Sequence, residues 1–562
     1  MKKILTLMLG AALTFAAAAQ DWQDARFFTE NNYLGTARTL GMGNAVTAIG
    51  GDPGSIGFNP AGSSVAGYSQ LVLSPGLTFS FTRAAGVFAP GASNPTGLGD
   101  VVNANFGRFA APNLGVILTL DSNRRSGWKR NAFGLVVNST NNYANRILGA
   151  GVNDDNSYAA SLATSAEGYT EEVLGSESWW YDGSDLSRMP KWVDMAGYRS
   201  GMFNGIPWSN NRYQAVTEVR DAYGNCWLAA PLYQKYGQQT SGSKYDIVLN
   251  WSANYEDRFY VGVNLGVTTL MYGMSEYFQE MPDNPDDFPD IVYTDGTVAR
   301  FSSLQMKHNY SLRGTGAYLK AGVLWRPVGG LRLAAAIQTP TIMTFTARQA
   351  YSGEVKLTGK SISPSTTPED EWAFSMTQPL RMNLGVAYSF GQVAVASLDY
   401  ELTPYGQIRY SGTQSGYTPG YLEDANLDIK DILGISHQLR AGVEVKPIPA
   451  LSLRAGYSLV GYGQKNWLDY ENGRWVTTPL TFQEKWSLAK HSASLGVGYA
   501  FGSFFLDAAV RVRFAPTEYI MPYQYYTYDT FTDKYPDTRV LTPEIAFQSR
   551  FVDAILTFGW RF

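Results

Sequence analysis

The sequence predicts an all-β protein, a 14-stranded antiparallel transmembrane β-barrel with an N-terminal hatch inside the lumen. Three observations lead to this prediction. Charged residues are only 16% and aromatic residues 14% of the 562 residues, whereas about 25% of a soluble globular chain is charged. The mean hydropathy of −0.18 excludes a bundle of apolar membrane helices. Finally, stretches of alternating apolar and polar residues recur along the chain, as in barrels, where only every second strand residue faces lipid.

Charge and cysteine content exclude several other classes of protein. The 44 Lys and Arg and 48 Asp and Glu residues give a net charge of −4, so there is no basic excess to bind nucleic acid. Cys226 is the single cysteine, which excludes an intrachain disulfide framework. His308, His437 and His491 are far apart in sequence and offer no metal-ligand spacing. We therefore expect no metal, no cofactor and no nucleic-acid partner.

The N-terminus has the pattern of a secretory signal. Lys2 and Lys3 precede the apolar run Ile4–Ala16, and three alanines at 17–19 supply an A-x-A cleavage site. We predict that residues 1–19 are a signal peptide and that the mature chain begins near Gln20. No later apolar run reaches the roughly 18 residues of a membrane helix.

Residues 20–68 do not alternate like strands and are rich in Gly and other small residues. Because glycine lets a backbone approach a surrounding wall closely, we predict that this segment is a compact hatch within the barrel. Pro60 fixes its own φ and biases Asn59 away from the helical region. This turn either faces the ligand or merely folds the hatch. The candidate ligand and hatch residues are Asn59, Pro60, Ala61, Gly41 and Gly43.

Residues 69–562 form the predicted barrel. In 245–255, for example, Ile247, Leu249 and Trp251 share one face, and Asp246 and Asn250 the other. Short and long connections alternate between the stretches, as between periplasmic turns and external loops, which places both chain ends in the periplasm. The fourteen predicted strands are 70–83, 113–121, 128–142, 245–256, 258–275, 305–326, 331–349, 379–390, 392–411, 436–447, 450–465, 491–501, 504–516 and 547–562.

The longest connection, 143–244, is predicted to be an extracellular insertion. It has weak helical character at 158–168 and five recurring tryptophans, which provide either an apolar surface for ligand capture or the small core of a folded loop. The second interpretation is favoured. These tryptophans are Trp179, Trp180, Trp192, Trp208 and Trp227.

Alternation also places basic side chains in the lumen. Guanidinium groups bind carboxylates through paired hydrogen bonds, so these residues form either a site for a ligand carboxylate or an ion-pair network that ties the wall to the hatch. Because buried charges must be paired, the network is favoured. The lumen candidates are Arg332, Arg381, Arg440 and Arg454, with Lys320, Lys446, Arg511 and Arg561 also inward, opposite Asp246, Asp399, Glu444, Asp507 and Asp553.

The last strand ends in an apolar face that includes Phe558, Trp560 and Phe562. This ending resembles the signal that the outer-membrane assembly machinery reads, so this machinery is an expected partner and the Gram-negative outer membrane the expected location.

The hatch motif Gly41-Met-Gly-Asn-Ala-Val-Thr-Ala48, followed by Asp52 and by Asn59-Pro60-Ala61, resembles the FadL/TodX family of outer-membrane transporters of hydrophobic compounds. Residues 314–327, 331–341 and 397–401 resemble its members from Bacteroidota-type bacteria. The resemblance implies a 14-stranded barrel with a hatch and passive uptake of hydrophobic small molecules such as long-chain fatty acids. In this family the ligand is captured outside, enters the lumen and leaves sideways through a wall gap into outer-membrane lipid.

Two other functions remain as alternatives. An outer-membrane enzyme is disfavoured, because the sequence has no G-x-S-x-G nucleophile elbow and no triad setting for its histidines. A barrel adaptor of a secretion or assembly machine is the second choice, and stoichiometric co-purifying partners would favour it. An open porin or an energy-coupled 22-stranded transporter fits the hatch and the strand number less well.

Overall fold

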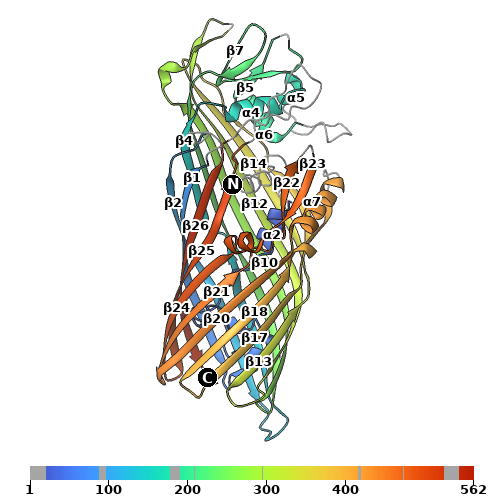
Figure 1. Cartoon of the computed structure of the whole chain (residues 1–562), viewed down its shortest axis with the longest axis vertical. Coiled ribbons are helices and arrows are strands. Elements are labelled where there is room, and N and C mark those ends of the chain that lie inside the picture. The colour runs from blue at the N-terminus through green and yellow to red at the C-terminus, as the bar shows by residue number, and fades with distance from the viewer. Residues whose placement is uncertain are drawn as a thin grey trace.

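A computed structural model describes residues 21–87, 97–176, 190–207, 209–293, 295–414, 419–471, 474–523 and 543–562 of the chain. The predicted signal peptide and Gln20 lie outside these residues. Figure 1 shows one tall barrel with helices and short strands gathered at the end opposite the C-terminus. In the described ranges no helix is long and apolar enough to cross a membrane.

The wall is a closed antiparallel sheet of fourteen strands, four of them in two segments. The first strand pairs with the last along its whole length, so the main sheet has no free outer edge of the kind that exposes unpaired backbone groups. In chain order the strands are β1 Gln70–Gly86, β2 Val102–Asp121, β3 Trp128–Asn142 with β4 Asn145–Asn153, β9 Leu232–Tyr255, β10 Phe259–Pro282, β12 Val298–Trp325, β13 Leu331–Gln338 with β14 Thr341–Thr358, β16 Asp370–Gln378 with β17 Arg381–Phe390, β18 Ala394–Pro404 with β19 Arg409–Gln414, β20 Ile435–Ile448, β21 Leu451–Val460, β24 Lys490–Phe501, β25 Phe504–Ile520 and β26 Ile545–Arg561.

The predicted fold is confirmed, since each predicted strand overlaps one wall strand. Two predicted strands are broken next to a proline, 331–349 at Pro340 and 392–411 after Pro404, because proline lacks the N–H that a ladder needs. At the insertion end the strands run further than predicted. There β4 and residues 232–240 of β9 pair with each other, so residues 145–153 and 232–244, at the two ends of the predicted insertion, belong to the wall.

The two faces of the wall strands have the predicted character. On β9 the side chains of Leu249 and Trp251 are exposed on the outside, whereas Asp246, Asn250 and Ser252 are buried on the inside. Exposed apolar side chains recur on the outer face of the other strands, which gives the wall an apolar exterior. The turn between β9 and β10 has positive φ at Glu256 and Asp257, as tight hairpin turns require.

The N-terminal segment, residues 21–66, consists of short helices and turns. Side chains cap them: Thr36 accepts from the Thr39 amide at one helix start, and Asn59 accepts from the Ala61 amide at another. Most of the segment is buried. Its elements are α2 Trp22–Thr29, α3 Ala37–Gly41, η2 Pro53–Ser55 and η3 Pro60–Val65.

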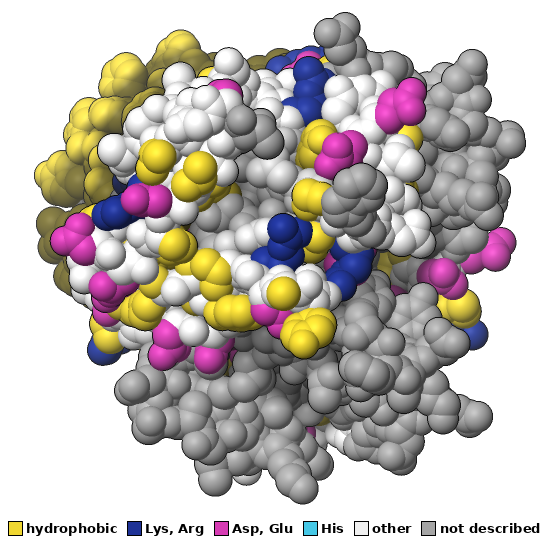
Figure 2. Space-filling model, turned by 90° about the horizontal axis from the view of Figure 1, so that it is seen from above, with side chains coloured by type: hydrophobic (Ala, Val, Ile, Leu, Met, Phe, Trp, Pro, Cys, Tyr) yellow, Lys and Arg dark blue, Asp and Glu magenta, His cyan; other side chains and the backbone are white. Residues whose placement is uncertain are grey.

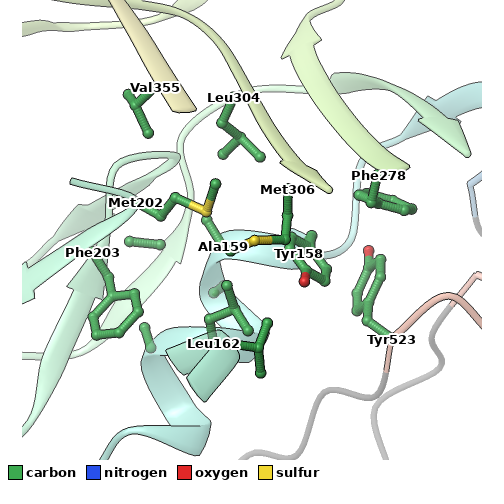
Figure 3. Packing of buried hydrophobic residues seen from close by; sticks show 14 of the residues in the cluster. Tyr158, Ala159, Leu162, Met202, Phe203, Phe278, Leu304, Met306, Val355 and Tyr523 are labelled. Atoms are coloured by element: carbon green, nitrogen blue, oxygen red, sulfur yellow. The ribbon is translucent and has the colours of Figure 1, made fainter. Parts of the chain in front are cut away.

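The insertion folds at the end of the barrel opposite the C-terminus, around a buried apolar cluster (Figure 3). Tyr158 of its first helix lies beside Phe278 and Met306 of the wall strands, and Leu162 belongs to the same cluster. Glu280 of β10 accepts hydrogen bonds from the Tyr158 amide and the Ser157 hydroxyl (both 2.7 Å), which fixes the helix start to the wall. The elements are α4 Tyr158–Ser165, α5 Glu171–Leu174, α6 Trp192–Arg199, β5 Phe203–Gly205, β6 Tyr213–Ala215, β7 Glu218–Arg220 and β8 Cys226–Leu228.

The predicted helix at 158–168 is present as α4. The insertion shares a buried apolar core with the wall strands beneath it. Trp192 packs against this core and Trp227 is exposed; Trp179, Trp180 and Trp208 lie outside the described residues. The remaining elements lie in the other connections. They are β11 Asp290–Val292, β15 Ser365–Thr366, α7 Pro419–Ile432, β22 Asn466–Glu471, β23 Arg474–Pro479, α8 Phe482–Ser487, η5 Pro285–Asp287 and η6 Tyr405–Gln407.

Seen from the insertion end, apolar, acidic and basic side chains are interspersed on the described surface (Figure 2). A larger apolar area belongs to the deeper part of the molecule at the upper left of this view. Apolar surface is therefore concentrated away from the end of the barrel.

We expect Asp194→Asn to stabilise the insertion at neutral pH. Asp194 of α6 is buried, and its carboxylate accepts a hydrogen bond from the Ser165 hydroxyl at 2.9 Å. Burial raises the pKa of Asp194 from 3.8 to about 6. Between these two values the folded chain holds a proton that the unfolded chain has lost, so stability falls as pH rises through this window. A shift of two units corresponds to about 2–3 kcal/mol.

Hydrogen exchange of α4 and α6, compared with the wild type at pH 4.5 and pH 7.5, measures this effect. Slower exchange in Asp194→Asn at the higher pH alone is the expected result. Asp154→Asn, at an exposed aspartate, is the control and should leave the exchange rates unchanged at both pH values. Equal protection of wild type and Asp194→Asn at both values would contradict the argument.

Candidate functional site

The N-terminal segment contacts the wall where two inward-facing glycines pair across strands. Gly262 of β10 pairs with Gly322 of β12, and a Cβ on either would overlap Asn59 or Pro60. The Asn59 amide donates to the Val323 carbonyl at 3.1 Å. The absence of side chains at these two wall positions is therefore what lets the turn at Asn59 reach the wall backbone.

A second glycine pair holds the region of Gly41 and Gly43. Gly442 of β20 pairs with Gly456 of β21, and a Cβ on either would overlap Met42 or Gly43. Gly43 itself has φ +62°, a conformation that L side chains rarely adopt. Both parts of the predicted hatch motif thus lie against backbone of the wall.

The lumen contains a cavity of about 650 Å³ on the insertion side of these contacts. Its walls come from α2 and the residues after it, the junction of β3 and β4, α7, and the inner faces of strands around the barrel. Phe27, Phe28, Tyr143 and Tyr272 form one aromatic side of it, with ring centroids 5.1 Å apart for Phe27 and Tyr143 and 5.3 Å for Phe28 and Tyr272. The size suits one small ligand.

None of the predicted residues Gly41, Gly43, Asn59, Pro60 and Ala61 lines this cavity. The segment faces the cavity instead with residues 21–24, 26–28, 30–33 and 44. The sequence signal for the cavity-facing part of the segment is the adjacent pair Phe27 and Phe28 in a helix with an N-cap. This signal is weaker than the glycine-rich motif at Gly41 and Gly43, which drew the prediction to a part of the segment that does not line the cavity.

The predicted lumen arginines are engaged in ion pairs and backbone contacts. Glu401 accepts from both Arg381 (3.3 Å) and Arg440 (2.6 Å), and all three side chains are buried. Arg454 bonds Glu444 at 2.6 Å. Glu401 is absent from the predicted inward acids, although it is in phase with Asp399 on β18.

Several of these cations also bind the N-terminal segment. Arg332 donates to the Ile49 carbonyl at 2.9 Å, Lys320 to Gly57 at 2.7 Å and Arg511 to Tyr33 at 3.0 Å. This arrangement is the predicted network between wall and segment. Lys446 is exposed, and Arg561 lies over the Phe505 ring.

One side of the cavity carries hydrogen-bond donors that are not satisfied among the described residues. Arg440 Nη1, Gln438 Nε2 and Arg513 Nη2 are buried and have no partner there, and all three residues line the cavity. Of the four principal lumen candidates only Arg440 lies at the cavity. Arg513 and Gln438 were not predicted, although each is two residues from an arginine that was, on the same strand face.

The hydrogen-bonded wall has a window between β2 and the strand formed by β3 and β4. The β2–β3 ladder ends at the pair Asn113 and Asn138, and the wall closes again where the Asp100 amide donates to the Ala150 carbonyl at 2.9 Å. Between these points neither β3 nor β4 pairs with β2 among the described residues. In Figure 1, β1, β2 and β4 lie side by side at the upper left of the barrel.

The window exists because the chain turns inward at the junction of β3 and β4. The Asn145 amide reaches the Ser549 hydroxyl on the inner face of β26 at 3.1 Å. The N-terminal segment holds this junction: the Asn32 amide donates to the Thr140 carbonyl (2.6 Å) and the Leu34 amide to Ser139 (3.1 Å). The junction, the segment and the cavity are therefore in direct contact.

Solved structures of hydrophobic-compound channels are similar to the chain in a search of known structures. The toluene transporter TodX of Pseudomonas putida is 10% identical, with 95% of this chain and 100% of TodX covered and a TM-score of 0.44. The toluene transporter TbuX of Ralstonia pickettii is 13% identical, with the same coverage and a TM-score of 0.43. A FadL homologue of Pseudomonas aeruginosa is 13% identical over 94% of this chain and 98% of its own, with a TM-score of 0.45.

No family model and no curated protein matches the sequence. These solved structures are of the kind that the sequence resemblance names. The fold follows from the strand pairing of the chain itself.

Proposed function

We propose that the protein is an outer-membrane channel for passive uptake of hydrophobic small molecules that carry an acidic head, such as long-chain fatty acids. The observation that carries this proposal is the direct contact between a ligand-sized lumen cavity, the segment beneath it and the window in the wall. The apolar exterior of the barrel supports a location in a membrane.

The cavity suits an amphipathic ligand. Its aromatic side, formed by Phe27, Phe28, Tyr143 and Tyr272, takes an apolar chain. The unsatisfied donors of Arg440 and Arg513 take a carboxylate, because a charged acceptor satisfies guanidinium nitrogens best. An apolar ligand without an acidic group would leave these donors unsatisfied, at a cost of about 1–3 kcal/mol for each.

The window suits release into the bilayer. The outward side chain of Phe109 on β2 is exposed beside the window, and those of Phe79 and Phe81 are exposed at about the same level on the adjacent strand β1, so the window opens at a level where the exterior is apolar. The proposed sequence is capture at the insertion end, binding in the cavity, rearrangement of the N-terminal segment with the junction that it holds, and lateral exit. The segment acts as the hatch, and Asn59 and the glycines of its motif anchor it to the wall.

Uptake of a fluorescent long-chain fatty acid by cells that lack their own transporter tests the proposal. We expect the wild-type chain to restore uptake and Arg513→Gln to raise the half-saturating concentration about fivefold, because a hydrogen bond to a charged group is lost. Arg348→Gln, at an exposed arginine, is the matched control and should behave as wild type.

Surface levels are matched by heat-modifiable gel mobility. Uptake of an uncharged alkane but not of the fatty acid would show that the ligands are hydrophobic molecules without an acidic head. Wild-type chain that reaches the surface and transports neither would contradict the proposal and favour the adaptor.

A further inference from the structure

We propose that Arg108 is a side-chain latch that holds the wall window shut, an inference that rests on the lateral exit proposed above. Arg108 lies on β2 within the part of that strand that has no ladder partner on the window side. Its guanidinium donates to the carbonyl of Gly242 on β9. The contact therefore joins β2 directly to β9, across the gap where the β3–β4 strand between them turns inward.

The backbone at Gly242 is shaped for this contact. Gly242 has φ +137°, and a Cβ there would overlap the Met271 carbonyl of the neighbouring strand. The same Gly242 carbonyl accepts from the Tyr143 amide at 3.2 Å. Tyr143 belongs to the inward junction and lines the cavity, so the latch and the junction share one acceptor.

A second contact crosses the window beside the first. The backbone amide of Ala111 on β2 is turned toward the hydroxyl of Tyr245 on β9. Both Arg108 and Tyr245 are half-buried. The neighbouring strands β9, β10 and β12 are held together by long ladders of backbone bonds, whereas here two side chains replace a ladder.

These contacts make the window easier to open than a neighbouring pair of wall strands that is joined by a ladder. A ladder of many bonds opens as a unit, but the window needs only the release of one guanidinium and one hydroxyl. Because the Tyr143 amide and Arg108 bind the same Gly242 carbonyl, movement of the junction shifts that carbonyl and thereby disturbs the Arg108 contact. Arg108 thus couples the occupied cavity to the exit, as a positioning residue and not as a ligand contact.

A measurement without ligand tests the latch itself. Spin labels at Asn105→Cys on β2 and Gln239→Cys on β9, both exposed positions, are placed in a Cys226→Ser background in lipid nanodiscs. We expect Arg108→Ala to shift the label distance to longer values and to broaden its distribution. Arg108→Lys keeps a cation and should shift it less, and Tyr245→Phe, which removes only a hydroxyl, should give a smaller shift in the same direction. Arg83→Ala, at an exposed arginine of β1, is the matched control and should leave the distances unchanged.

Uptake of the fluorescent fatty acid then tests the role of the latch. At equal surface level Arg108→Ala is expected to increase the uptake rate about fivefold, the effect of losing one hydrogen bond to a charged group. Unchanged label distances in both Arg108→Ala and Tyr245→Phe would overturn the latch, whatever the protein transports. Longer distances with wild-type uptake would overturn its control of exit. Longer distances with no uptake by the wild type would instead refute the proposed function and leave the latch standing as a wall contact.

Discussion

Gly322→Val is expected to detach the hatch from the wall and to open the lumen to ions. A side chain at this position would overlap the Asn59 amide and lie within 2.8 Å of the Pro60 ring. Overpacking of this kind costs about 1–3 kcal/mol, and the bond from Asn59 to the Val323 carbonyl is lost with it. Since about 1.4 kcal/mol is a factor of ten in an equilibrium, we expect ion conductance across planar bilayers to rise about tenfold or more.

Gly329→Val is the matched control, because the turn at Gly329 has no neighbouring atom within 4 Å of an added Cβ. It should keep wild-type conductance. Protease added from the periplasmic side should cut the N-terminal segment faster in Gly322→Val than in the control. A folded Gly322→Val barrel with low conductance and a protected segment would show that the hatch does not depend on this pair of glycines.

The sequence predicts the wall best where one face meets an apolar environment. β3 spans Trp128–Asn142, as predicted, because exposed apolar side chains such as Phe133 and Leu135 alternate with buried inward residues through its centre. Residues 232–244 continue β9 but carry polar side chains on both faces, such as the inward Gln238 and the exposed Gln239, so they present no apolar face. There the strand is held by pairing alone, and pairing between distant segments leaves no periodic signal in either of them.

The candidate site was only partly predictable for a related reason. Alternation correctly places Arg381, Arg440 and Arg454 inside, since it is a property of each strand by itself. Whether an inward arginine meets a partner or the cavity depends on the stagger of several strands and on the hatch. The window cannot be predicted from a local sequence pattern. It arises where one strand separates from the next, and the backbone of the separating strand stays extended.

Glu401→Gln is expected to destabilise the barrel strongly. The Glu401 carboxylate is fully buried and accepts from two guanidinium groups, those of Arg381 and Arg440. Its amide replacement leaves two buried cations with no counter-charge at that point. Arg381 also donates to the Thr29 carbonyl of the hatch, so the hatch end of this network loses its support too. Breaking a buried ion pair by removing one partner costs about 3–5 kcal/mol, which urea unfolding of the purified barrel in lipid vesicles measures.

The exposed pair of Arg348 and Glu371 provides the control, with the same 2.6 Å separation as the Arg440–Glu401 pair. Glu371→Gln should cost at most about 1 kcal/mol, because water screens exposed charges and solvates the arginine that is left. The comparison measures the effect of burial together with that of the second arginine on Glu401, since the residue types and the shorter distance are the same in both pairs. An equally small loss in Glu401→Gln would mean that water or a ligand carboxylate reaches Arg440 and replaces the glutamate. In that case the lumen arginines would belong to the ligand site rather than to the framework that holds the hatch.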